Sequence, residues 1–178
     1  MRIIGGTHKG RLLKVPKGLP VRPTTDFAKE GLFNVLANAL YFDELKVLDL
    51  FSGTGHISLE FGSRGVPEII AVDKHIGCVN FLRTISSELN LPINVIKQDV
   101  FNFLNENTKQ FDLIFADPPY DLPNIEHIHE LVFQKQLLKP NGILIIEHGP
   151  STKLDLLHGF QKLKKYGNVN FSFFQQIN

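Results

Sequence analysis

Four consecutive residues in the second half of the chain are suited to holding an amino group for alkylation. Asp117-Pro118-Pro119-Tyr120 follows the buried-strand run 113–116. The Asp117 carboxylate and the Pro118 carbonyl can both accept hydrogen bonds from one amino group. Pro119 has no N–H and fixes its own φ, which stiffens the turn, and the Tyr120 ring can stack on a planar base. By itself Asp-Pro-Pro is more often an ordinary loop with a helix cap, so a second motif has to decide.

That second motif is a strand, a glycine turn and a helix over residues 45–61. An apolar run, 45–50, leads into Gly53-Thr54-Gly55, and an amphipathic segment follows. Such a βα unit brings backbone close to a nucleotide-like ligand, and glycine is needed where a Cβ would collide or forbid the dihedrals. The next apolar strand ends at Asp73, where a carboxylate suits the two hydroxyls of a ribose.

The residues around the glycine turn indicate which nucleotide it binds. A dinucleotide site has a third glycine and places a pyrophosphate on the helix N-terminus. Here Ser58 occupies the third position, and Asp49, just before the turn, would repel a pyrophosphate. The same carboxylate suits a cation. S-adenosylmethionine carries an ammonium, a sulfonium and a ribose, so the sequence predicts this cofactor.

Together with two N-terminal signatures, these motifs make the chain resemble the RsmD family, bacterial methyltransferases that act on the exocyclic N2 of a guanine in 16S ribosomal RNA. The resemblance covers nearly the whole chain. It depends on Arg2-Ile3-Ile4-Gly5-Gly6 with Lys9-Gly10-Arg11, on Arg22-Pro23-Thr24-Thr25-Asp26 with Lys29-Glu30 and Leu32-Phe33-Asn34, on Asp-x-Phe-x-Gly-x-Gly at 49–55, and on Asp-Pro-Pro at 117–119. The last two motifs occur in many methyltransferases, whereas the first two point to this family.

The chain departs from the family pattern at two positions. Phe27 stands where the family often has a basic residue, which removes one possible RNA-facing cation. His56 stands beside the glycine turn, where a small residue would be unremarkable. We expect His56 to be a solvated loop histidine without a catalytic role.

The resemblance implies a set of site residues. Asp117, Pro118 and Tyr120 are expected to hold the acceptor amine. The residues expected to bind the cofactor are Asp49, Phe51, Gly53, Gly55, Asp73 and Asp99. Asp99 follows the predicted strand 93–97 and is explained nearly as well as a helix cap. No metal is expected, because the single cysteine, Cys78, leaves no cysteine pair for zinc and is predicted to be buried on a helix.

The remaining sequence alternates between strand and helix signals, which predicts an α/β fold with a mostly parallel sheet. Strands are predicted at 45–50, 68–73, 93–97, 111–116 and 142–147, and helices from residue 26, at 75–89 and at 124–138, the last ending at Lys139-Pro140-Asn141-Gly142. Gly167-Asn168 predicts a terminal hairpin of 160–166 and 169–174. The resemblance implies a Rossmann-like class I methyltransferase with seven strands in the order 3-2-1-4-5-7-6 and an N-terminal β-hairpin extension.

Basic residues are concentrated at the N-terminus. Residues 1–22 carry six cations and no acid, although the whole chain has a net charge of only +1. This predicts a basic hairpin arm and linker at 1–22, ahead of a methyltransferase domain at 23–178. The residues predicted to contact RNA phosphates are Arg2, Lys9, Arg11 and Arg22. The alternative is a solvated hairpin whose lysines protect an edge strand. A second group, Lys162, Lys164 and Lys165, is interpreted as ordinary surface.

The expected partner is therefore ribosomal RNA, within an assembled or partly assembled small subunit, and the protein is expected to be monomeric. The chain has no run of 18 apolar residues and no signal peptide, so a cytoplasmic location is expected. Two alternatives stay open. One is methylation of another amine, adenine N6 in DNA or RNA or a protein glutamine. The other is a non-catalytic RNA-binding module on a methyltransferase fold, against which the intact motif aspartates and glycines argue.

Overall fold

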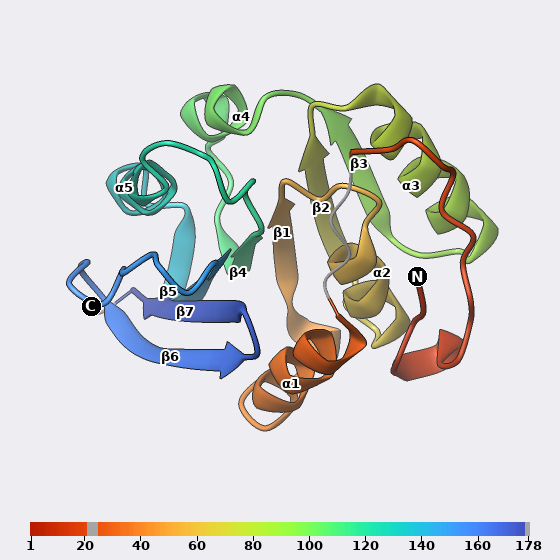
Figure 1. Cartoon of the computed structure of the whole chain (residues 1–178), viewed down its shortest axis with the longest axis horizontal. Helices are drawn as coiled ribbons and strands as arrows, with labels where there is room; N and C mark the ends of the chain where they lie inside the picture. The colour runs from red at the N-terminus through yellow and green to blue at the C-terminus, as the bar shows by residue number, and fades with distance from the viewer. Residues whose placement is uncertain (21–24, 177–178) are drawn as a thin grey trace.

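A seven-stranded sheet forms the centre of the computed structural model, which describes residues 1–20 and 25–176 (Figure 1). Its strands are β1 (Lys46–Leu50), β2 (Glu68–Asp73), β3 (Ile93–Lys97), β4 (Phe111–Ala116), β5 (Leu138–His148), β6 (Phe160–Tyr166) and β7 (Val169–Gln175). The order is β3-β2-β1-β4-β5-β7-β6, and β7 runs antiparallel to both of its neighbours. The predicted fold class and strand order are confirmed.

Five α-helices lie in the described part of the chain: α1 (Asp26–Ala37), α2 (His56–Ser63), α3 (Ile76–Glu88), α4 (Val100–Glu106) and α5 (Glu126–Gln134). Short 3-10 turns occur at Gly6–His8 and Phe42–Glu44. One sheet face packs against α4 and α5, and the other packs against α1, α2 and α3. Strands β1 and β4 are covered on both faces, which explains their nearly continuous apolar sequences.

The first five strands, β1 to β5, are parallel, so their carboxyl ends lie at one edge of the sheet. The chain adds β2 and β3 on one side of β1 and then returns to add β4 and β5 on the other side. The strand order therefore reverses between β1 and β4, which are neighbours in the sheet. In open α/β sheets a crevice forms at such a switch point and is the usual place for a ligand. Both sequence motifs, the glycine turn after β1 and Asp-Pro-Pro-Tyr after β4, therefore meet at this crevice.

The predicted N-terminal hairpin is present in reduced form. Its antiparallel pairing consists of one β-bridge between Arg2 and Leu12, supported by backbone hydrogen bonds from Ile3 N to Arg11 O (3.0 Å) and from Leu13 N to Met1 O (2.8 Å). Ile3 and Leu13 are buried against the α3 side of the sheet. In Figure 1 the red N-terminal segment continues past α3 toward the end of the view where β2 and β3 terminate.

The predicted helix 124–138 and the stop signal assigned to it need correction. The helix predicted to end at 138 ends at Gln134, because Gln136 takes a left-handed φ of 52° and Leu138 already belongs to β5. Lys139-Pro140-Asn141-Gly142 therefore lies inside β5, at an irregularity in its pairing with β4, and does not follow a helix. The N-terminus of α1 agrees with the sequence, since Thr25 caps it by accepting a hydrogen bond from Ala28 N.

Candidate active site

A cavity of about 650 Å³ opens at the carboxyl ends of β1, β2 and β4. Its walls come from the glycine turn, the segments after β2 and β3, and the segment after β4. The sequence-predicted residues that line it are Phe51, Gly53, Asp73, Asp99, Asp117, Pro118 and Tyr120. The fold therefore brings together residues that span 70 positions of the sequence, whereas Asp49 and Gly55 are not part of the cavity wall.

The glycine turn is built from left-handed residues. Phe51, Gly53 and Gly55 have φ values of 59°, 51° and 81°. At Gly55 a Cβ would lie 2.2 Å from the Leu82 side chain, so this glycine also permits α3 to pack against the turn. The sequence predicted a conformational or ligand-contact reason for the glycine. The structure adds close packing of α3 as a second reason.

Asp49 lies behind the turn, with only 1% of its surface exposed. It accepts hydrogen bonds from the backbone N of Ser58 (3.1 Å) and from the Ser58 hydroxyl. The pKa of Asp49 is raised to about 7, mainly by burial; the nearby Asp117 and Asp73 carboxylates contribute to this rise, and the Ser58 hydrogen bonds oppose it. Among the described residues no cation forms an ion pair with Asp49. Three carboxyl groups, those of Asp49, Asp73 and Asp117, therefore lie within electrostatic reach of one another at this crevice.

Asp73, at the end of β2, is already held by backbone donors. One carboxylate oxygen accepts from Gly53 N at 2.8 Å, and the other accepts from His75 N at 2.7 Å. The side chain thus connects the glycine turn to the start of α3. Each carboxylate oxygen has a second lone pair, which is what a ribose hydroxyl needs.

Asp99 combines both interpretations given to it from the sequence. One of its oxygens caps α4 by accepting from Phe101 N (3.0 Å) and Asn102 N (3.2 Å), and the residue also lines the cavity. The neighbouring Phe101 ring meets the Phe51 ring edge to face, with centroids 6.3 Å apart. Both rings line the cavity, so this wall is aromatic with a carboxylate beside it.

The Asp-Pro-Pro-Tyr segment forms the opposite wall. Its first residue is tied to the sheet by a hydrogen bond from Asp117 N to Leu50 O at 3.3 Å, and the turn is closed by Leu122 N donating to Pro119 O at 2.9 Å. The Tyr120 ring is 39% exposed and lies at the cavity. It packs over Gly149, where a Cβ would be only 3.2 Å from the ring.

The prediction that His56 is a solvated loop residue is wrong, whereas its lack of a catalytic role stays a prediction. His56 is the first residue of α2 and lines the cavity, and its Nε2 is buried with no hydrogen-bond partner among the described residues. Burial lowers the pKa of His56 to about 3, and the positive charge of Lys29 contributes. The imidazole is therefore neutral at physiological pH. The sequence signal was the unusual histidine itself, and its place at the N-terminus of α2 beside the cavity depends on the tertiary fold.

Other wall residues were not predicted as part of the site. They are Pro20, Ser52, Thr54, Lys74, His75, Cys78, Val100, Phe101, Pro119, Asp121 and Leu122. Most are sequence neighbours of a predicted residue, so proximity to the motifs was the available signal. Cys78 is buried as expected, and burial together with Asp73 raises the pKa of its thiol to about 11.

Within the described residues, no helix is both long and apolar enough to cross a membrane.

Comparisons with known proteins agree with these motifs. The profile of a family described as conserved hypothetical protein 95 matches residues 1–175. The chain belongs to this family. It is the RsmD family that the sequence motifs indicated, and the structural frame is that of a class I methyltransferase.

Individual members of the RsmD family and their structures are similar over most of the chain. YlbH of Bacillus subtilis, provisionally named an rRNA methyltransferase, is 35% identical over 159 residues, which cover 86% of this chain and 85% of YlbH. Ribosomal RNA small subunit methyltransferase D of Haemophilus influenzae is 32% identical over 152 residues, 83% and 78% of the two chains. The solved structure of yhhF from Escherichia coli, provisionally named a methyltransferase, has a TM-score of 0.85 at 28% identity and covers 99% of this chain and 97% of that chain.

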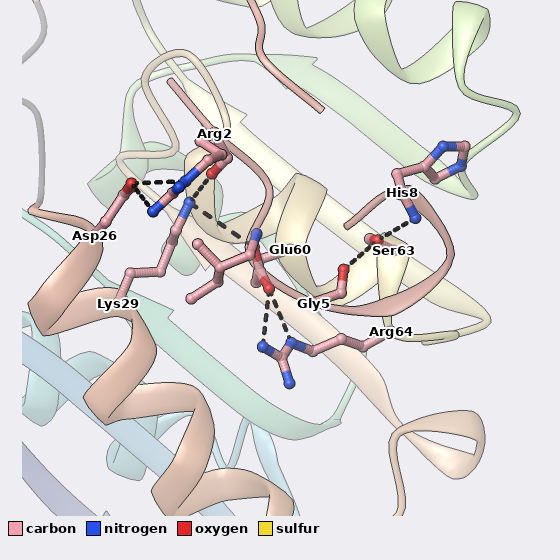
Figure 2. A network of polar contacts seen from close by, with 9 residues as sticks. Arg2, Gly5, His8, Asp26, Lys29, Glu60, Ser63 and Arg64 are labelled. Carbon is pink, nitrogen blue, oxygen red and sulfur yellow. Dashed lines mark hydrogen bonds and ion pairs between the residues drawn. The ribbon is translucent and has the colours of Figure 1, made fainter. Parts of the chain in front are cut away.

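The opening motif of this RsmD-family chain fixes the N-terminal segment to helix α2. Ser63 Oγ donates to Gly5 O (2.6 Å) and accepts from His8 N (2.9 Å), as Figure 2 shows. A Cβ on Gly6 would lie 1.8 Å from Ser63 O, so glycine is required for this close approach. The glycines of the motif therefore serve packing between the arm and α2.

A buried charged network completes this attachment. Glu60 of α2 is fully buried and accepts from Ile4 N (3.0 Å) and from Arg64 (2.9 Å). Lys29 of α1 is 2% exposed, lies 3.7 Å from Glu60 and donates to Arg2 O (Figure 2). Burial lowers the pKa of Lys29, and the Glu60 charge opposes this shift. The arm is thus part of the packed structure.

The predicted RNA-binding cations of the arm differ in their surroundings. Arg2 is half-exposed and forms an ion pair with Asp26 at 3.0 Å. Lys9 and Arg11 are exposed on the arm. Arg22 lies outside the described residues. Two of the four predicted cations are therefore presented to solvent without an ion-pair partner in the described part of the chain.

Proposed function

We propose that this protein transfers the methyl group of S-adenosylmethionine to the exocyclic N2 of a guanine in 16S ribosomal RNA. One observation carries the proposal: the acceptor-side residues Asp117, Pro118 and Tyr120 line the same cavity as the nucleotide-side residues Gly53 and Asp73. A methyl donor and a planar amine can then meet inside one cavity. The names of the RsmD-family relatives support ribosomal RNA as the substrate.

The residues around the glycine turn fit a cationic nucleoside. The carboxyl groups of Asp49, Asp73 and Asp117 suit the ammonium and sulfonium of the cofactor. Asp73 would hold the ribose, and Asp99 would accept a hydrogen bond from the adenine amino group. The Phe51 and Phe101 rings supply the apolar wall that an adenine ring needs. When bound, S-adenosylmethionine supplies a methyl group that is electrophilic because it is carried on a sulfonium.

The acceptor side has to make a poor nucleophile reactive. The lone pair of a guanine amino group is delocalised into the purine ring. Hydrogen bonds from the amino hydrogens to the Asp117 carboxylate and the Pro118 carbonyl would localise that lone pair. Well-oriented groups can save about 7–11 kcal/mol of the barrier. Extraction of the base from its stack costs a few kcal/mol, and stacking on Tyr120 would recover part of this cost.

The N-terminal arm would contact the phosphate backbone of the RNA. Lys9 and Arg11 are exposed for this contact, and Arg2 would have to exchange Asp26 for a phosphate. We further propose that the substrate is an assembled or partly assembled small subunit, that the protein acts as a monomer, and that it is located in the cytoplasm.

Tritium transfer from labelled S-adenosylmethionine to ribosomal RNA, DNA and protein tests the proposal. We expect label in small-subunit ribosomal RNA, recovered as N2-methylguanosine after nuclease digestion. Label in adenine or in protein glutamine would assign the same cavity to another amine. Absence of transfer to all three, by a protein that still binds S-adenosylhomocysteine, would support the non-catalytic RNA-binding alternative. An Asp117→Ala variant is the matched background control.

A further inference from the structure

Strand β6, at the outer edge of the sheet, presents basic side chains on one face. Lys162, Lys164 and Tyr166 are paired across the ladder with Phe173, Phe171 and Val169. Directly paired residues of antiparallel strands point to the same side of a sheet, and these three partners belong to the core beneath α1 and α2. The two lysines and the tyrosine therefore share the α1 face, and both lysines are exposed.

An exposed aromatic side chain continues this row. Phe27, in the first turn of α1, is 67% exposed and meets the Tyr166 ring edge to face at 5.7 Å. The Tyr166 ring is fixed by α1, since a Cβ on Gly31 would lie 2.1 Å from it. Tyr166 thus contacts one side of the Phe27 ring, and most of the Phe27 ring stays exposed to solvent. We call the row of Lys162, Lys164, Tyr166 and Phe27 the β6 stripe.

The β6 stripe ends beside the cavity. Tyr166 pairs with Val169 at the first residue of β7. The next residue, Asn170, donates from Nδ2 to Gly149 O at 3.5 Å. The Tyr120 ring of the cavity wall packs over Gly149. A chain of neighbouring contacts therefore connects the stripe to the acceptor side of the cavity.

We propose that the β6 stripe binds the single-stranded RNA next to the acceptor nucleotide. Lys162 and Lys164 contact neighbouring phosphates, and one flanking base stacks on Phe27. The inference deepens the proposed function and rests on it. Residues two apart on a strand are separated by about 6.6 Å, and a row of cations ending in an aromatic ring is what sequence-tolerant binding of single strands uses. Phe27, where the family often has a basic residue, then supplies stacking in place of charge.

Binding of a guanine-containing single-stranded RNA oligonucleotide to the full-length protein at several salt concentrations tests the stripe. The Lys162→Gln/Lys164→Gln double variant should lower the slope of log affinity against log salt by about 1.4, at about 0.7 per phosphate contact. Phe27→Ala should weaken binding by about tenfold, the effect of one lost stacked base, and Phe27→Tyr should retain it. The matched control is Lys165→Gln/Lys109→Gln, which removes two exposed lysines that lie outside the α1 face of β6.

Several outcomes overturn the proposal: an unchanged slope in the folded stripe variant, an equal loss in the control, no RNA binding by the unaltered protein, or binding of anionic vesicles in place of RNA. The same experiments separate failure of the β6 stripe from failure of the proposed function. If the stripe variants bind RNA normally and still methylate guanine, the stripe is wrong and the enzymatic function stands. If the unaltered protein binds RNA through the stripe without methylating guanine, the reverse holds.

Discussion

Two buried carboxyl groups, Glu60 on α2 and Asp49 on β1, have different surroundings. Glu60 is surrounded by Lys29, Arg64 and the Ile4 N–H. Among the described residues Asp49 accepts hydrogen bonds from Ser58 alone, and burial, with a smaller contribution from Asp117 and Asp73, raises its pKa. The carboxylate with a structural role, Glu60, is paired with cations of the protein itself, Lys29 and Arg64. Where a cationic ligand is expected, the Asp49 carboxyl has no ion-pair partner among the described residues. Substitutions in the Glu60 network should therefore change stability, and those around the cavity should change binding or turnover.

The largest effect is expected at Glu60. Glu60→Gln should lower the free energy of unfolding by about 3–5 kcal/mol, because it leaves the buried Lys29 charge without a carboxylate. Urea denaturation measures this change. The matched control is Glu68→Gln, which breaks the half-exposed ion pair with Lys46 and should cost less than about 1 kcal/mol. Similar small losses in both variants would contradict the structural role of the Glu60 network.

Substitution of Asp117 should lower the rate of methyl transfer and leave the affinity for the cofactor nearly unchanged. Asp117→Ala is expected to lower the single-turnover rate of methyl transfer at least about a hundredfold, which corresponds to about 2.7 kcal/mol of barrier. Affinity for S-adenosylhomocysteine should stay within a few-fold, because this carboxylate faces the acceptor amine. Asp117→Asn should keep partial activity through its carbonyl oxygen. A near-normal rate for the alanine variant would contradict the assigned mechanism.

Substitution of Asp73 should mainly weaken the binding of the cofactor. Asp73→Ala is expected to weaken binding of S-adenosylhomocysteine by more than about tenfold, since hydrogen bonds to a charged group contribute about 1.5–3 kcal/mol each. The substitution also leaves Gly53 N and His75 N without their acceptor, so some loss of thermal stability should accompany it. Calorimetric titration measures the affinity. An unchanged dissociation constant would remove Asp73 from the cofactor site.

The pKa of Asp49 predicts a pH dependence of cofactor affinity. Below the folded pKa of about 7 the carboxyl is mostly protonated, so a cation must displace that proton in order to bind. Affinity for S-adenosylmethionine should therefore rise between pH 5.5 and 7, by at most about tenfold per pH unit, and level off above pH 7. His56, with a pKa of about 3, stays neutral over this range. Asp49→Asn should flatten the profile, and an unchanged profile in that variant would assign the dependence to another group.

The smallest effect is expected from the N-terminal arm, whose packed side is structural. Neutralising Arg2, Lys9 and Arg11 together should lower the salt slope of RNA binding by about 2–3 if all three contact phosphates. The Lys9→Gln/Arg11→Gln pair alone should account for about 1.4–1.8 of it, because Arg2 already has Asp26 as a partner. Cofactor affinity should not change. A lower melting temperature with an unaltered slope would make these cations purely structural.

The sequence by itself determined the fold and the motif residues of the cavity wall. Buried strands, the glycine turn and the Thr25 cap are local signals, and the strand limits at β2, β3 and β4 agree with the predicted ranges. Strands that end in motif residues bring those residues to one edge whenever the sheet is parallel. Asp73, Asp99 and Asp117 could therefore be placed together before their distances were known.

Only the tertiary structure decided how each charge is satisfied. The contact between Glu60 and Ile4 joins residues 56 positions apart, and no local pattern encodes such a pair. The tertiary fold likewise left the His56 side chain half-buried at the cavity, and packing of α3 against the glycine turn means that Gly55 must admit Leu82. The register between β6 and β7 placed Lys162 and Lys164 on the sheet face that α1 packs against. Periodicity is a property of one segment, whereas burial and ion pairing depend on what the neighbouring segments bring into contact.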